Sequence, residues 1–264
     1  METSNQEIQV VPTSAIELIT KAEIDMQITT AKAYPRSIKT FLDKAESLAT
    51  ISEDVAQSCI YTLPRGNKQV EGPSVRFAEI ICSTYGNIRA GARVIANDGK
   101  TITAQGICHD LETNNSATVE VKRKITDKNG RTYNEDMQTV TGNAACSIAY
   151  RNAVLKVVTT ALVSGIYEKV KEVARGTAET LTIRRDKAIN YLKSLNVTEK
   201  QILQVLELKK IQDIDLDKLS VLRGMVTLIL NGESTVKDLF EEPTGADKKE
   251  NLKAAQGAGK VDLP

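Results

Sequence analysis

Basic side chains gather in one stretch of the sequence, and their spacing suits contact with phosphate groups. Five of them fall within ten positions, namely Lys122, Arg123, Lys124, Lys128 and Arg131. Four more precede them and could extend the same stripe, namely Arg65, Lys68, Arg89 and Arg93. Lysine and arginine neutralise nucleic-acid phosphates, so this stripe predicts a polyanion contact. The competing interpretation is that these are solvated residues on an open sheet face or an edge guarded by lysine.

Residues for covalent chemistry are few. His109 is the single histidine, no nucleophile motif surrounds any Ser or Cys, and no GxxxxGK[ST] phosphate loop occurs. A metal-dependent nuclease would need a carboxylate pair, and the candidates occupy expected turns and exposed strands, which favours solvation: Asp98, Asp110, Glu112, Glu120, Glu135 and Asp136. We therefore expect a protein that is not an enzyme and uses no cofactor or metal.

Composition indicates the cellular compartment in which the protein works. The 264 residues are 41% hydrophobic and 26% charged, which is ordinary for a globular protein. No apolar run approaches the roughly 20 residues of a membrane span, and the polar N-terminus is no secretory signal. The cysteines lie more than twenty residues apart beside apolar neighbours, as buried free thiols do: Cys59, Cys82, Cys108 and Cys146. A cytoplasmic protein without a membrane partner is expected.

Charge is distributed unevenly along the chain. The formal net charge is +1, but residues 1–59 carry 5 basic and 9 acidic residues, whereas residues 60–175 carry 16 and 11. The positive excess thus coincides with the basic stripe. Its modest size makes it weak evidence for a polyanionic partner when taken alone.

The stripe requires a sheet to position it. A short helix is expected from Pro73 to Gly86, followed by strands at Ile88–Ala96, Thr101–Leu111 and Ala117–Thr126. A fourth strand could follow Asn129 and Gly130. The last element, Thr141–Val163, is rich in small residues and should form a long helix packed closely on the sheet. The predicted class is α+β, an antiparallel β-meander backed by a long helix.

The third strand shows best which side chains share a face. Alternation places Val119 and Val121 on one side and Glu120, Lys122 and Lys124 on the other. Arg123 falls on the otherwise apolar side.

The flanking segments complete the expected domain organisation. Helices at Ser14–Ala31, Ser37–Leu48 and from Ser52 form an N-terminal segment, residues 1–59, that would pack on the core or on a neighbouring subunit. An extended connector then enters the core, residues 60–175. Helices at Thr177–Leu195, Thr198–Leu208 and Leu216–Leu230 form a small C-terminal domain, residues 176–242, and residues 243–264 form a flexible tail.

The order of these features resembles a known family. The helix ending in Tyr85-Gly86-Asn87, the meander with its basic hairpin, the segment Arg131–Asp136 and the helix containing Ala149–Val154 resemble the DNA-annealing domain of the Rad-fifty-two recombination mediators. They are also similar to phage single-strand annealing recombinases of the Erf type. The resemblance covers about residues 60–170.

The resemblance implies a β-β-β-α core that assembles into rings or helical arcs. It implies binding of single-stranded DNA through the backbone, and annealing of complementary strands without ATP in recombination and repair, in a bacterial host cytoplasm. By this resemblance, Arg65 and Arg151 match basic positions of the groove. The chain departs from the family further along the long helix, where the family carries a basic pair and this chain has Thr159 and Thr160, with Lys156 about one turn earlier. By analogy, the C-terminal domain could dock a phage exonuclease or the host single-strand-binding protein. The open alternatives are an oligomeric phage assembly protein and, last, a metal-dependent nuclease.

Tyrosine could add base stacking. Tyr61 and Tyr133 lie near the basic connector and strands, but ordinary half-buried packing is the favoured interpretation for both.

Overall fold

A computed structural model describes residues 13–65, 68–127, 129–176 and 180–240. Its class is α+β, as predicted, with two antiparallel sheets. The strands are β1 (Ile60–Arg65), β2 (Lys68–Pro73), β3 (Ile88–Asn97), β4 (Thr101–Asp110) and β5 (Ser116–Lys124). The helices are α1 (Thr13–Ala33), α2 (Ile38–Ala49), α3 (Glu53–Ser58), α4 (Val75–Tyr85), α5 (Glu135–Val157), α6 (Thr160–Arg175), α7 (Leu181–Ser194), α8 (Glu199–Leu206), α9 (Leu216–Leu230) and α10 (Val236–Phe240). None of these helices is long and apolar enough to cross a membrane.

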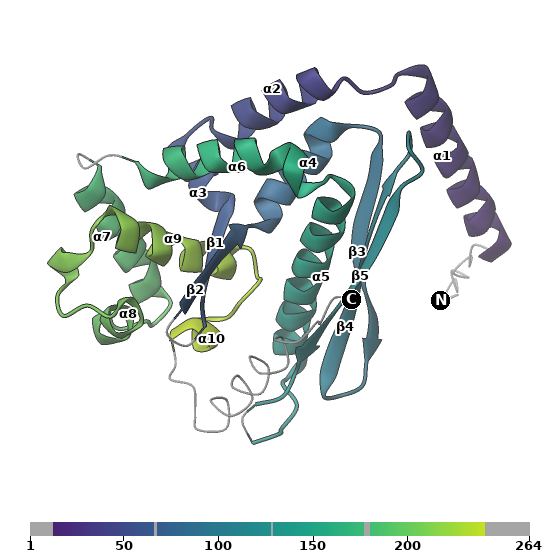
Figure 1. Ribbon diagram of the computed structural model, residues 1–264. Coiled ribbons are helices and arrows are strands. Elements are labelled where there is room, and N and C mark those ends of the chain that lie inside the picture. The colour runs from purple at the N-terminus through teal and green to yellow at the C-terminus, as the bar shows by residue number, and fades with distance from the viewer. Residues whose placement is uncertain (1–12, 66–67, 128, 177–179, 241–264) are drawn as a thin grey trace, which may run out of the picture.

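The predicted meander forms the larger sheet, in the order β3-β4-β5 (Figure 1). The β3–β4 turn is closed by Asp98, whose carboxylate accepts hydrogen bonds from the amides of Lys100 and Thr101, while Gly99 adopts a φ of 79°. After β5 the expected fourth strand is reduced to a single bridge between Thr126 and Thr132.

Helix α5 covers one face of the meander, and the contact is as close as its small residues predict (Figure 1). Ala145 and Ala149 are fully buried against the sheet. A Cβ atom added to Gly106 of β4 would lie 2.2 Å from the carbonyl oxygen of Ala149. Glycine is therefore required at this position, because the helix backbone occupies the space of a side chain.

The expected long helix, 141–163, had wrong boundaries. Helix α5 already begins at Glu135, since Asn134 caps it by accepting a hydrogen bond from the Met137 amide. It ends at Val157, because Val158 is extended and Thr159 is non-helical, and α6 starts at Thr160. Four consecutive β-branched residues at positions 157–160 make this a weak point for helix, because branched side chains lose rotamer freedom there.

The connector predicted as merely extended is a β-hairpin. Strands β1 and β2 pair from Ile60 with Pro73 to Arg65 with Lys68. The C-terminal helices pack on this hairpin, with Tyr61 and Leu63 contacting their core. Gly224 of α9 lies so close to Thr62 that an added Cβ would be 2.3 Å from its hydroxyl oxygen. The helices after residue 180 thus share a core with the preceding part of the chain.

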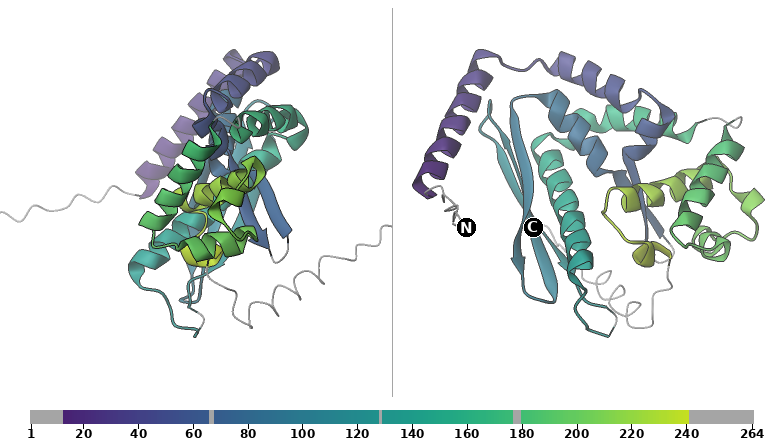
Figure 2. Two further views of the ribbon diagram at one scale, coloured as in Figure 1. Left: turned by 90° about the vertical axis from the view of Figure 1, so that its left-hand side faces the viewer. Right: turned by 180° about the vertical axis from the view of Figure 1, so that it is seen from behind.

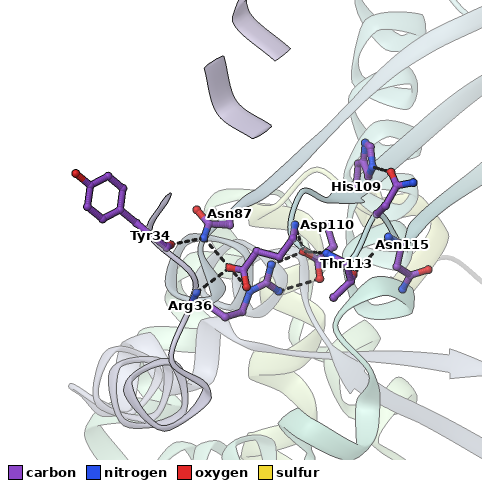
Figure 3. Close-up of polar contacts among 9 residues, drawn as sticks. Tyr34, Arg36, Asn87, His109, Asp110, Thr113 and Asn115 are labelled. Atoms are coloured by element: carbon purple, nitrogen blue, oxygen red, sulfur yellow. Dashed lines mark hydrogen bonds and ion pairs between the residues drawn. The ribbon is translucent and has the colours of Figure 1, made fainter. Parts of the chain in front are cut away.

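An ion-pair network fixes the link between α1 and α2 to the end of the meander (Figure 3). The guanidinium of Arg36 donates to both carboxylate oxygens of Asp110, and its Nε donates to Glu112 at 2.9 Å. Asn87 joins by donating to Glu112 at 2.6 Å and to the Tyr34 carbonyl at 2.8 Å. We call these five residues the Arg36 network. It sets the direction in which α1 leaves the body of the protein.

Candidate nucleic-acid interface

The face of the meander that α5 does not cover is the outer face. Side chains alternate along the strands, so Ile102, Ala104 and Cys108 of β4 are buried beneath α5. Their neighbours Gln105 and His109 belong to the outer face. On β5 the predicted alternation is confirmed, because exposed and half-buried residues alternate from Ser116 to Lys124.

Four predicted basic residues meet on the outer face: Arg89, Arg93, Lys122 and Lys124. Their register with β4 orders them, because these four residues pair in turn with His109, Gln105, Thr103 and Thr101. They therefore run diagonally from the β3 edge to the β5 edge. Eight residue steps along β4 correspond to about 27 Å. We call the four residues the basic diagonal.

Most of the basic diagonal is exposed to solvent. Arg93, Lys122 and Lys124 are exposed, and Arg93 and Lys122 form no hydrogen bond or ion pair with other described residues. Arg89 is half-buried and donates to Gln27 of α1 at 3.3 Å. Within the three strands, the outer face carries one acidic residue, Glu120. The surface is therefore net positive.

The turns at one end of the sheet continue this charge. Lys100 and Arg131 are both exposed, and the Thr132 hydroxyl bonds the Gly99 carbonyl at 2.7 Å, which joins the two turns. Hydrogen bonds from the amides of Thr101 and Lys100 lower the pKa of Asp98 to about 2, with a smaller effect from nearby Lys122. This aspartate stays ionised at neutral pH and offsets part of the local positive charge.

Arg123 and Arg151 lie elsewhere and have protein partners. Arg123 is on the inner side, as its alternation predicted, and donates to the Glu233 carbonyl at 3.0 Å and to Asp238 at 3.5 Å. Arg151 is buried and forms a 2.6 Å ion pair with Glu233, which is 2% exposed. Both arginines tie the segment after α9 to the core. Arg123 is therefore not on the same face as the other basic residues of its strand, and the position of Arg151 does not support the groove implied by the resemblance.

The remaining predicted cations are also off the outer face. Lys156 is exposed at the end of α5. Arg65 and Lys68 end the β1–β2 hairpin, which lies on the α5 side of the meander (Figure 1). Lys128 and the expected tail, 243–264, fall outside the described residues.

The two candidate tyrosines are packing residues. Tyr61 lies under the guanidinium of Arg151, 4.7 Å from ring centroid to carbon, and Tyr133 packs beside the core under α5. Burial is the main reason that the pKa of Tyr133 is raised. The described outer face has no Phe, Tyr or Trp, so a bound strand would be held there by phosphate contacts more than by stacking.

Sequence reasoning missed the contribution of β4 to this face. Every second residue of β4 is polar, with the exception of Ile107: these are Thr101, Thr103, Gln105 and His109. This alternation was the available signal. Lys100 was missed because it lies in the turn before β4, outside the alternating residues of the strand.

The carboxylates considered for a nuclease do not assemble. Asp110 and Glu112 are both engaged by Arg36. Among the residues that the structure describes, no three His, Cys, Asp or Glu side chains could together hold a metal ion.

Comparison of the chain with protein-family models, with curated proteins and with solved structures finds no match.

Proposed function

We propose that the protein binds single-stranded DNA along the basic diagonal and promotes annealing of complementary strands without ATP. The observation that carries this proposal is the placement of four cations on one open sheet face. Lysine and arginine would contact phosphates and leave the base edges free to pair. The absence of aromatic residues from the described outer face supports a sequence-independent mode of binding.

Self-association belongs to the same proposal. Four cations release few counterions, so one subunit would bind DNA weakly at physiological salt. Copies arranged in a ring or helical arc would line up their diagonals and multiply the contact. We place this activity in a bacterial cytoplasm during phage recombination, with the C-terminal helices available for an exonuclease or the host single-strand-binding protein.

A salt series with a labelled single-stranded oligonucleotide tests the binding. If four phosphates are neutralised per subunit, the logarithm of the association constant should fall with a slope of about −2.8 against the logarithm of salt concentration. Affinity would then drop about 50-fold between 50 and 200 mM salt. In Lys122→Ala/Lys124→Ala the slope should be about −1.4, and the same salt step should cost only about 7-fold.

The matched control removes two exposed lysines from the C-terminal helices. Lys187→Ala/Lys200→Ala lowers the net charge equally and should keep the wild-type slope. Annealing of complementary oligonucleotides should persist in the presence of a metal chelator. A metal-dependent nuclease activity would be lost under the same conditions. A folded wild-type protein that fails to bind at low salt would overturn the proposal and leave an assembly protein as the better hypothesis.

A further inference from the structure

Helix α1 carries an uncovered apolar stripe: Leu18, Ile19, Ala22 and Met26. These positions share one side of a helix. Leu18 is 68% exposed, Ile19 56% and Met26 65%. Exposed large apolar residues gathered on one side of a helix mark a contact surface, whereas single ones are normal.

The stripe points away from its own chain. The opposite side of α1 carries Ile24 and Ile28, which are half-buried, and Gln27, which accepts the hydrogen bond from Arg89. Ala31, near the end of the helix, is fully buried. Figures 1 and 2 show α1 on the far side of the meander from α5, projecting beyond the α1–α2 link that the Arg36 network anchors. The helix is thus an arm held in place at its base.

A second uncovered surface lies along β3. This strand is an edge of the sheet, and every residue from Arg93 to Asn97 is exposed, with Val94 at 45% and Ile95 at 42%. Beside it, a hollow of about 470 Å³ opens between β3 and the first half of α5. Val94, Ile102 and Gly142 are among its lining residues, together with polar side chains. A long edge with exposed apolar residues is normally shielded, and a covering helix is one way to do so.

We propose that α1 of one copy docks its apolar stripe over the β3 edge and this hollow in a second copy. The two elements match in length, because 21 helical residues span about 32 Å and ten strand residues about 34 Å. Charge favours this arrangement over pairing of two α1 helices. Helix α1 has three acidic and two basic residues, whereas β3 has two arginines and no acidic residue.

The contact is head-to-tail, because the arm and the edge are different surfaces. Each docked copy still presents a free arm or a free edge, so the contact repeats until a ring closes or a filament grows. The outer faces of successive copies would follow one another around such an assembly. This inference deepens the self-association in the proposed function, but it is tested without DNA, so either can fail alone.

Complementary variants test it by light scattering after size exclusion. The arm variant is Leu18→Glu/Met26→Glu and the edge variant is Ile95→Glu, with Thr139→Arg at the rim of the hollow as a second edge variant. Wild type should elute above the monomer mass of 28.8 kDa, and each variant alone should be monomeric. An equimolar mixture of arm and edge variants should form a dimer that grows no further, since one intact arm meets one intact edge.

The control is Ile183→Glu/Leu230→Glu, which alters residues that are 63% and 62% exposed on other helices and should assemble as wild type does. Circular dichroism establishes that each variant is folded. A monomeric wild type, or folded arm and edge variants that keep the wild-type mass, would overturn the proposal. Monomeric variants whose mixture stays monomeric would also overturn it, because a head-to-tail contact requires that they complement each other.

Discussion

Removing the Arg36 side chain should strongly destabilise the fold. The Arg36 side chain is 7% exposed and its partner Asp110 4%, so this is a buried ion pair. The guanidinium also lies 3.9 Å from the ring centroid of Tyr85, so Arg36→Ala removes a stacking contact together with the hydrogen bonds to Asp110 and Glu112.

The expected magnitude follows from what is left behind. Breaking a buried pair by removing one partner costs about 3–5 kcal/mol, since the remaining charge loses its compensation. Asp110 would keep the hydrogen bond from the Glu112 amide, at 3.0 Å, but no cation. For a chain of this length, that loss corresponds to a fall in Tm of about 6–20 °C. Thermal unfolding followed by circular dichroism measures it.

The pH dependence gives a second, independent signature. Burial alone would raise the pKa of Asp110, but hydrogen bonds from Arg36 and from the Glu112 amide outweigh burial and hold it below its ordinary value. The pKa of Glu112 is likewise lowered, because bonds from Asn87 and Arg36 outweigh its burial. A carboxyl group whose pKa is lower in the folded than in the unfolded protein stabilises the fold at any pH above its unfolded-state pKa. This stabilisation is lost as the pH falls through the folded-state pKa. The free energy of unfolding of the wild type should therefore decrease once the pH drops below about 4.

In Arg36→Ala the pKa shift of Asp110 should change direction, because a buried aspartate without a cation has a raised pKa. Acidification should then relieve the destabilisation caused by its buried charge. The difference between wild type and variant should be largest near neutral pH and narrow on acidification. Arg76→Ala is the matched control, since it breaks an exposed pair with Glu79 whose side chains are 51% and 45% exposed; its cost should stay below about 1 kcal/mol. Equal, small losses for both variants would refute the assignment of the Arg36 network as the anchor of α1.

Two further predictions concern the core. Gly106→Ala should destabilise the protein by about 1–3 kcal/mol in chemical denaturation, because the new methyl group would push α5, at Ala149, away from β4. Gly91→Ala, with no atom near its added Cβ, should be neutral or stabilising, and comparable effects of both would contradict the close contact. Burial raises the pKa of Cys59 and Cys108 to about 12. Both thiols should therefore resist alkylation at pH 8 until the protein is unfolded. Rapid labelling of either one in the native state, measured by mass spectrometry, would be inconsistent with this burial.

Local patterns were enough to predict most elements. Ser37 and Ser52 do cap α2 and α3, Gly86 ends α4 with a φ of 70°, and the alternation of Glu120 and Lys122 places both on the outer face. Caps, turns and alternation depend on residues within a few positions of each other, and such information is contained in the sequence. The β1–β2 hairpin also had a local signal, the Gly66-Asn67 pair between two strand-like runs, which we overlooked.

Long-range pairing could not be predicted in this way. Arg123 looks like a member of the basic stripe and Arg151 like a groove residue of the family. Each of them nevertheless bonds Glu233, whose position beside them is set by the packing of α9 on β1. Arg89 and Lys122, 33 positions apart in sequence, belong to one diagonal only because β4 fixes the register between their strands. The sequence alone determined which residues carry charge and which strand face each occupies. Only the tertiary structure decided which charges remain open to a ligand, because that depends on partners distant in the chain.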